Sequence, residues 1–84
     1  MQNDQIKALI SDGIPGSYVE VAGDDGTHFE AIIASDSFIG LNMVQQHQLV
    51  YKALGEKMGR EIHALSIQTF TPDQWEKKKR LRVI

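Results

Sequence analysis

The sequence predicts an α+β fold in which a three-stranded sheet has helices packed on one face. Three observations lead to this prediction. Two segments rich in β-branched and aromatic residues, 17–23 and 27–34, lie on either side of turn residues in GDDG and predict a β-hairpin. Residues 42–58 have apolar side chains at helical spacing, and residues 61–70 alternate as a strand does. With one helix at each end, the predicted order is αββαβα.

A short helix is predicted before the hairpin, in the segment NDQIKALISDGIPG (3–16). Asn3 or Asp4 can cap its start, and Gly13 and Pro15 end it. Its apolar side chains recur at helical spacing and share one face: Ile6, Leu9 and Ile10.

The hairpin leads through a connector to a central helix. The connector is SDSFIG (35–40), in which Gly40 can adopt a backbone conformation that other residues avoid. The helix is predicted from residue 42 or 43 to residue 58, and Gly59 ends it. Residues on one stripe of this helix recur every three or four positions: Met43, His47, Val50, Leu54 and Met58.

A third strand is predicted at residues 61–70, and the last helix follows it directly. Thr71 is the predicted N-cap, Pro72 takes the first helical position, and Gln74 completes a capping box. This helix contains Trp75 and then the basic sequence KKKRLR.

Length and composition favour a small binding protein over an enzyme. Its 84 residues make one domain, 1–84, with a basic C-terminal helix and tail at 72–84. A domain of this size buries only about 60% of its unfolded surface, which leaves little room for a deep cleft. The absence of cysteine excludes disulfides and thiolate catalysis by this chain, and no nucleophile or phosphate-binding motif is found. Neither a membrane span nor a signal peptide is recognisable, so a cytoplasmic protein is expected.

Charge is divided unevenly along the chain, whose net charge is −2. Residues 1–42 have seven acids and one lysine, a balance of −6, whereas residues 43–84 have eight bases and four acids, a balance of +4. Basic residues concentrate in the tail: Lys77, Lys78, Lys79, Arg80 and Arg82. They are either a solvated helix end that complements the helix dipole or a patch that contacts phosphates in a salt-sensitive, sequence-blind way.

The three histidines have different expected roles. His47 is interpreted as a structural residue of the central helix. His28 begins the second strand, and alternation places His63 on one face of the third strand with Leu65 and Ile67. Each is a half-exposed structural histidine, or the two rings emerge at the same end of the sheet and bind a metal. Two imidazoles make an incomplete site, because closed metal sites generally have about four ligands.

Three segments together resemble the BolA family, most closely its IbaG (YrbA) branch. They are GDDGTHFEAII (23–33), FIGLNMVQQHQLVYKAL (38–54) and IHALSIQTFTPDQW (62–75), so the resemblance covers nearly the whole chain. It implies a fold like that of class II KH domains. It also implies a monothiol glutaredoxin partner, with a [2Fe–2S] cluster bound between the two proteins.

The resemblance assigns cluster ligation to two residues. His63 matches the histidine of the family's HAL segment, and His28 matches the variable cysteine or histidine of its hairpin loop. The sulfur absent from this chain would come from the glutaredoxin cysteine and bound glutathione. No cofactor is expected on this chain alone.

The resemblance also leaves a second function open, that of a DNA-binding transcriptional regulator of stress responses that uses the KH-like surface of residues 43–70. Two departures weaken nucleic-acid binding. Gln46 stands where the family usually has arginine, and GLNM (40–43) has only the first glycine of a G-x-x-G loop. DNA and a second copy of the chain stay open as partners. A scaffold that binds another protein through its sheet edge is a third alternative.

Overall fold

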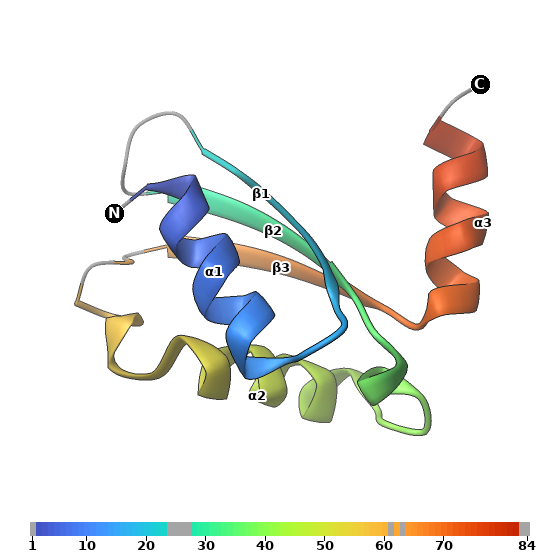
Figure 1. Cartoon of the computed structure of the whole chain (residues 1–84), viewed down its shortest axis with the longest axis horizontal. Coiled ribbons are helices and arrows are strands. Elements are labelled where there is room, and N and C mark those ends of the chain that lie inside the picture. The colour runs from blue at the N-terminus through green and yellow to red at the C-terminus, as the bar shows by residue number, and fades with distance from the viewer. Residues whose placement is uncertain (1, 24–27, 61, 63, 83–84) are drawn as a thin grey trace.

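The computed structural model describes residues 2–23, 28–60, 62 and 64–82 (Figure 1). The helices and strands follow the predicted αββαβα order. Two short 3₁₀ segments lie on either side of the central helix, η1 (Asp36–Phe38) and η2 (Gly55–Lys57). The six main elements are α1 (Asn3–Gly13), β1 (Tyr18–Ala22), β2 (His28–Ala34), α2 (Met43–Leu54), β3 (Ala64–Phe70) and α3 (Pro72–Arg82).

The sheet is mixed, with strand order β1-β2-β3. Strand β1 pairs antiparallel with β2, and Tyr18 lies opposite Ala34. Strands β2 and β3 run parallel, so that His28 lies opposite Ala64 at their starts and Ala34 lies opposite Phe70 at their ends. The sheet therefore has one end where β2 and β3 begin and another where they finish.

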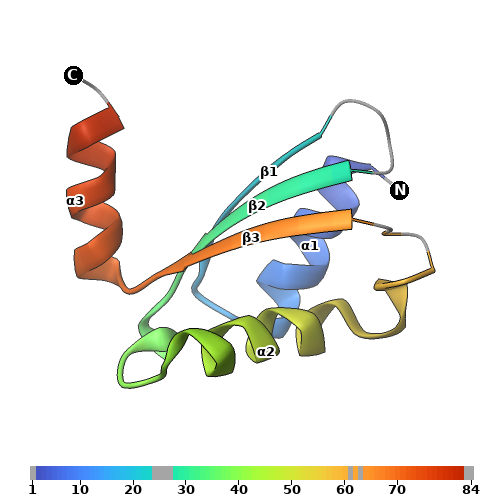
Figure 2. The ribbon, with the colours of Figure 1, turned by 180° about the vertical axis from the view of Figure 1, so that it is seen from behind.

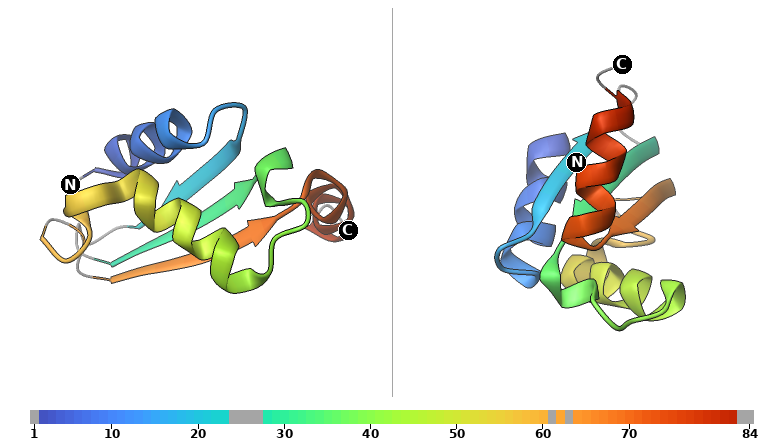
Figure 3. Two further views of the ribbon diagram at one scale, coloured as in Figure 1. Left: turned by 90° about the horizontal axis from the view of Figure 1, so that it is seen from below. Right: turned by 90° about the vertical axis from the view of Figure 1, so that its right-hand side faces the viewer.

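Helices α1 and α2 cover one face of this sheet (Figures 2 and 3). Every second residue of β2 faces them, and the core is formed by apolar side chains from both layers. The core includes Ile6, Ile10, Val19, Phe29, Ala31, Ile33, Val50, Leu54 and Ile62. The prediction that helices pack on one face of the sheet is therefore confirmed for α1 and α2.

Helix α3 meets the sheet differently, and projects from its far end (Figure 1). Its Trp75 is buried and stacks on Tyr18, with 5.1 Å between ring centroids, and contacts Phe70 in a tilted arrangement at 5.6 Å. Tyr18 and Phe70 alternate with core-facing residues and so lie on the opposite face from α1 and α2. The predicted capping box is present, because the Gln74 side chain accepts from the Thr71 N–H at 2.9 Å.

Three features of the element ends differ from the sequence prediction. Helix α1 begins at Asn3, so its N-cap is Gln2, whose N–H donates to the Gln5 side chain at 2.7 Å, and not Asn3 or Asp4. Helix α2 ends at Leu54 and not at residue 58, because Gly55 takes a positive φ of 59° and starts η2. Strand β3 begins at Ala64 and not at 61, and Ile62 is fully buried in the core, where strict alternation would place it on the opposite face with Ser66. The helices within the described residues are all too short or too polar to cross a bilayer.

Candidate functional site

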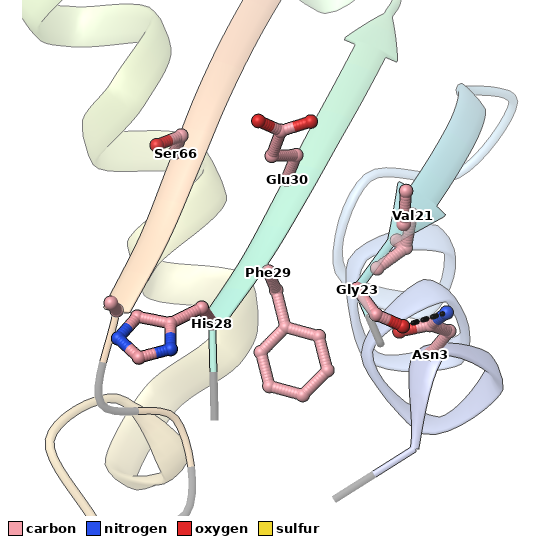
Figure 4. Close-up of a pocket in the computed structure, with 9 residues that line it drawn as sticks. Asn3, Val21, Gly23, His28, Phe29, Glu30 and Ser66 are labelled. Atoms are coloured by element: carbon pink, nitrogen blue, oxygen red, sulfur yellow. Dashed lines mark hydrogen bonds between the residues drawn. The ribbon is translucent and has the colours of Figure 1, made fainter. Parts of the chain in front are cut away.

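A hollow of about 740 Å³ lies at the end of the sheet where β2 and β3 begin (Figure 4). His28, Glu30 and Ser66 contribute polar side chains to it, all three exposed. They share the sheet face that α1 and α2 leave open, because His28 and Glu30 are two residues apart and Glu30 lies opposite Ser66. Among the described residues, the hollow opens to solvent.

The position of His28 is fixed by its neighbours in the chain. The Phe29 side chain points inward and is buried, which anchors the start of β2 to the core. Gly23 approaches the same segment closely, since an added Cβ there would lie 2.6 Å from the His28 carbonyl oxygen and 2.8 Å from Phe29 Cδ1. Asn3 in turn donates a hydrogen bond to the Gly23 carbonyl at 3.2 Å. Helix α1, the end of β1 and the start of β2 are thus held together around His28.

The second predicted ligand, His63, lies outside the described residues, and so do Asp24 and Asp25 of the hairpin turn. Its role therefore stays a prediction. The structure does describe the next residue in the chain, Ala64, whose Cα pairs with that of His28 across the parallel strands. Chain position 63 is thus one peptide unit from the register partner of His28.

The donor set that the structure describes is incomplete for a metal. No group of three or more His, Cys, Asp or Glu side chains that could hold an ion occurs among residues 2–23, 28–60, 62 and 64–82. The chain has no cysteine at all. Glu30 is the acid that shares the hollow with His28. The residues that the structure describes therefore do not by themselves make a closed metal site.

His47, the predicted structural histidine, lies on α2 and is partly exposed. Its Nε2 atom is buried and has no hydrogen-bond partner within the described part of the chain. The two other residues interpreted as structural have clear roles, because Gly40 takes a positive φ of 82° in the connector and Trp75 seats α3 on the sheet.

Sequence reasoning missed Gln46, which is 8% exposed on the inner side of α2. Its Nε2 donates to the carbonyl oxygens of Phe38 at 3.3 Å and Leu41 at 3.0 Å, and its Oε1 accepts from the Thr69 hydroxyl. Met43, predicted to begin the apolar stripe, is instead 62% exposed. The only signal in the sequence was a glutamine at a position where an arginine is usual in the family it resembles.

The basic residues of the tail lie at the other end of the molecule. Lys77, Lys78, Lys79 and Arg80 are exposed on α3, and Arg82 is its last residue. Lys79 forms an ion pair with Glu76 at 3.2 Å. Because β3 has seven residues, its two ends are about 20 Å apart. The structure therefore does not bring the basic residues to the histidine site.

Comparison with known proteins places these features in one family. The family model for BolA-like protein matches residues 13–74. The acid stress protein IbaG of Escherichia coli is 34% identical over 82 residues, which are 96% of each chain. Human BolA-like protein 1 is 46% identical over 55 residues, 66% of this chain but only 40% of the human protein.

Two further comparisons concern fold and function. The structure of a bolA protein homologue from Coxiella burnetii superimposes with a TM-score of 0.82 at 43% sequence identity, covering 90% of this chain and 97% of that one. A Haemophilus influenzae protein named DNA-binding transcriptional regulator BolA is 40% identical over 50 residues, which are 60% of this chain and 48% of the relative. The order of elements and the mixed sheet described above match this group of structures.

Proposed function

Because the chain belongs to the BolA-like protein family, we propose that it is a non-enzymatic adaptor that binds a monothiol glutaredoxin and shares a [2Fe–2S] cluster with it. His63 and His28 are the proposed ligands from this chain. The glutaredoxin cysteine and its bound glutathione supply the sulfur. The proposed setting is iron–sulfur cluster trafficking or the regulation of iron and stress responses, and the name of the acid stress protein IbaG supports the link to stress.

The observation that carries this proposal is the register of β2 and β3. His28 pairs with Ala64, and His63 is the residue bonded to Ala64. The parallel arrangement gathers the two starting segments at one end of the sheet. We therefore propose that the partner docks at this end of the sheet, where β2 and β3 begin.

The composition of the site supports a cluster that is bound jointly with a partner over one that is held by this chain alone. The chain lacks cysteine, and the hollow beside His28 is wide and open. Neutral imidazole in place of thiolate makes a bound [2Fe–2S] centre less negative and raises its reduction potential, as in Rieske centres. This chain would hold and orient the imidazoles, with Phe29 and Gly23 fixing the strand that presents His28.

Titration of a cluster-loaded monothiol glutaredoxin with this protein tests the proposal. Visible absorption and circular dichroism report the ligands of the cluster, so we expect both spectra to change until one equivalent has been added. His63→Ala should abolish the change and His28→Ala should reduce it. The matched control is His47→Gln, which removes the third histidine, on α2, and should leave the titration as in the wild type.

Two results would contradict the proposal. One is an unchanged spectrum with the wild-type protein, which would remove cluster sharing. The other is a full spectral change with the His63→Ala variant, which would remove the ligand assignment while leaving glutaredoxin binding intact. Far-UV circular dichroism of each variant separates a lost ligand from a lost fold.

The second candidate function is that of a DNA-binding regulator. Four exposed basic residues on a single helix favour it, and so does the name of the Haemophilus influenzae relative. The net charge of −2 opposes it, because the acidic part of the chain repels a polyanion.

This candidate predicts binding to duplex DNA that falls steeply as salt is added. Replacing Lys77, Lys78 and Lys79 by glutamine should weaken that binding. The matched control is Lys7→Gln, an exposed lysine on α1 that lies outside both α3 and residues 43–70. Absent binding at low ionic strength, or binding that salt does not change, would exclude this function.

A further inference from the structure

We propose that the groove between α2, the end of β3 and α3 is a second docking site, and that it takes an acidic amphipathic helix of another protein. This groove has a volume of about 570 Å³. It lies at the end of the sheet away from His28, so the proposal goes beyond cluster sharing and does not depend on it.

The floor and walls of the groove provide apolar anchors. Met43 at the start of α2 and Leu81 near the end of α3 line it together with Phe70, the last residue of β3. Met43 is 62% exposed and Leu81 is 71% exposed. Methionine adapts its shape to different partners, which suits a surface that receives a side chain from another protein.

The apolar surface extends beyond the groove itself. Six large apolar residues are exposed in the described part of the chain. Two of them, Ile39 and Val44, lie close to Met43 in the sequence. Ile39 is 64% exposed and Val44 is 65% exposed. Four of the six thus belong to the connector before α2, to the first turn of α2 or to α3, and exposed apolar side chains are typical of interaction sites.

The charge of the groove selects the partner. The charged side chains that line it are Lys77 and Lys78, one turn before Leu81 on α3. Neither lysine forms a salt bridge within the described residues, whereas their neighbour Lys79 is paired with Glu76. Their methylene stems add to the apolar wall while the ammonium groups stay in water. An occupant with apolar residues on one face and carboxylates beside them satisfies both features.

The same features favour a protein segment over nucleic acid. Single strands bind to proteins through aromatic platforms for the bases. The aromatic side chain in this groove, Phe70, is already engaged with Trp75. Anchors at Met43 and Leu81 instead match a helix laid in a groove, with apolar residues at positions i, i+3, i+4 and i+7.

Binding of a fluorescein-labelled synthetic helical peptide to the full chain tests the proposal. The peptide has leucines at i, i+3, i+4 and i+7 and glutamates on the flanks. Two control peptides replace the glutamates by lysine or the leucines by serine. Fluorescence anisotropy should show saturable binding of the acidic peptide, and binding at least about tenfold weaker for each control.

Variants of the chain locate the site. Met43→Gln with Leu81→Gln removes the apolar anchors, and Lys77→Glu with Lys78→Glu reverses the charge. Both pairs change exposed residues, so the fold should persist, which far-UV circular dichroism checks. Each pair should weaken peptide binding by about tenfold. The matched controls are Tyr51→Gln and Lys52→Glu, which are exposed on α2 outside the groove and should leave binding unchanged.

Four outcomes would overturn the proposal. In the first, the groove variants would bind the acidic peptide as tightly as the wild type does. In the second, the lysine peptide would bind as tightly as the acidic one. In the third, a mixed-sequence single-stranded oligonucleotide would displace the labelled peptide at a lower concentration than the unlabelled peptide does. In the fourth, light scattering would show that the free chain is a dimer and that Met43→Gln with Leu81→Gln dissociates it. The occupant of the groove would then be a second copy of this chain. The glutaredoxin titration is unaffected by any of these results.

Discussion

Gln46 shows how one polar side chain in the core can fix the shape of a loop. Its amide reaches two carbonyls of the connector and the Thr69 hydroxyl of β3. Buried polar groups are costly unless they are paired, so these contacts hold the connector between η1 and α2 against the sheet. The connector contains Gly40, whose positive φ allows the chain to turn into α2.

Replacing Gln46 by leucine should therefore destabilise the protein. The substitution introduces an apolar side chain of similar size and leaves two carbonyls and one hydroxyl without this partner. We expect a loss of about 1–3 kcal/mol in the free energy of unfolding, measured by urea denaturation. Gln48→Leu on the exposed side of α2 is the matched control and should change stability by less than about 0.5 kcal/mol. Equal effects of the two substitutions would contradict this role of Gln46.

Residue patterns predicted the position of His28 but not that of Gln46. A histidine after turn residues, before an alternating strand, can be placed at the strand start from sequence alone. The inward position of Gln46 depends on carbonyls that only the folded connector brings within reach. Helical spacing predicts Met43 on the core stripe, but Met43 is 62% exposed and lines a groove together with Phe70 at the end of β3.

At the scale of elements, α1 and α2 approach each other closely at one point. An added Cβ on Gly13 would lie 2.4 Å from the Cβ of Ala53. The sequence predicts Gly13 only as a helix stop, and it does end α1. Its lack of a side chain also lets the two helices pack together over the sheet.

Gly13→Ala tests this close approach. At an unhindered site this substitution stabilises a protein by about 0.4–1 kcal/mol. Here we expect the opposite sign, a loss of about 1–3 kcal/mol in urea denaturation, because the new methyl group overlaps Ala53. The double variant with Ala53→Gly should recover part of the loss in a double-mutant cycle. Stabilisation by Gly13→Ala alone would contradict this expectation, because it would mean that α1 and α2 move apart and accommodate the new methyl group without cost.

Local signals predicted the elements better than their limits. The hairpin turn and the capping box at Thr71 are set by a few adjacent residues, and both strands of the hairpin and the start of α3 lie where predicted. The start of β3 depends on tertiary packing. Ile62 is drawn into the core and pairs with Met58 in an isolated bridge, so the regular ladder begins only at Ala64.

At the scale of the whole molecule, the sheet separates two surfaces of different character. One end presents His28 beside a polar hollow, and the other presents apolar side chains with lysines. The strands between them are about 20 Å long. An adaptor needs two such surfaces if it is to bind two partners at once.

This arrangement predicts independent binding at the two ends. The dissociation constant of the acidic peptide should change by no more than about twofold when cluster-loaded glutaredoxin is present at saturation, because distant sites behave additively. Fluorescence anisotropy of the labelled peptide measures it. Displacement of the peptide by glutaredoxin would mean that both partners use one surface.

The central claim is that histidine nitrogen from this chain binds the iron of a cluster held by its partner. Electron–nuclear double resonance tests it most directly, with isotope-labelled histidine nitrogen in this chain, unlabelled glutaredoxin, and the cluster reduced by one electron. We expect a strong hyperfine coupling to the labelled nitrogen that disappears in the His63→Ala variant. A complex whose reduced cluster shows no coupling to that label would contradict the claim.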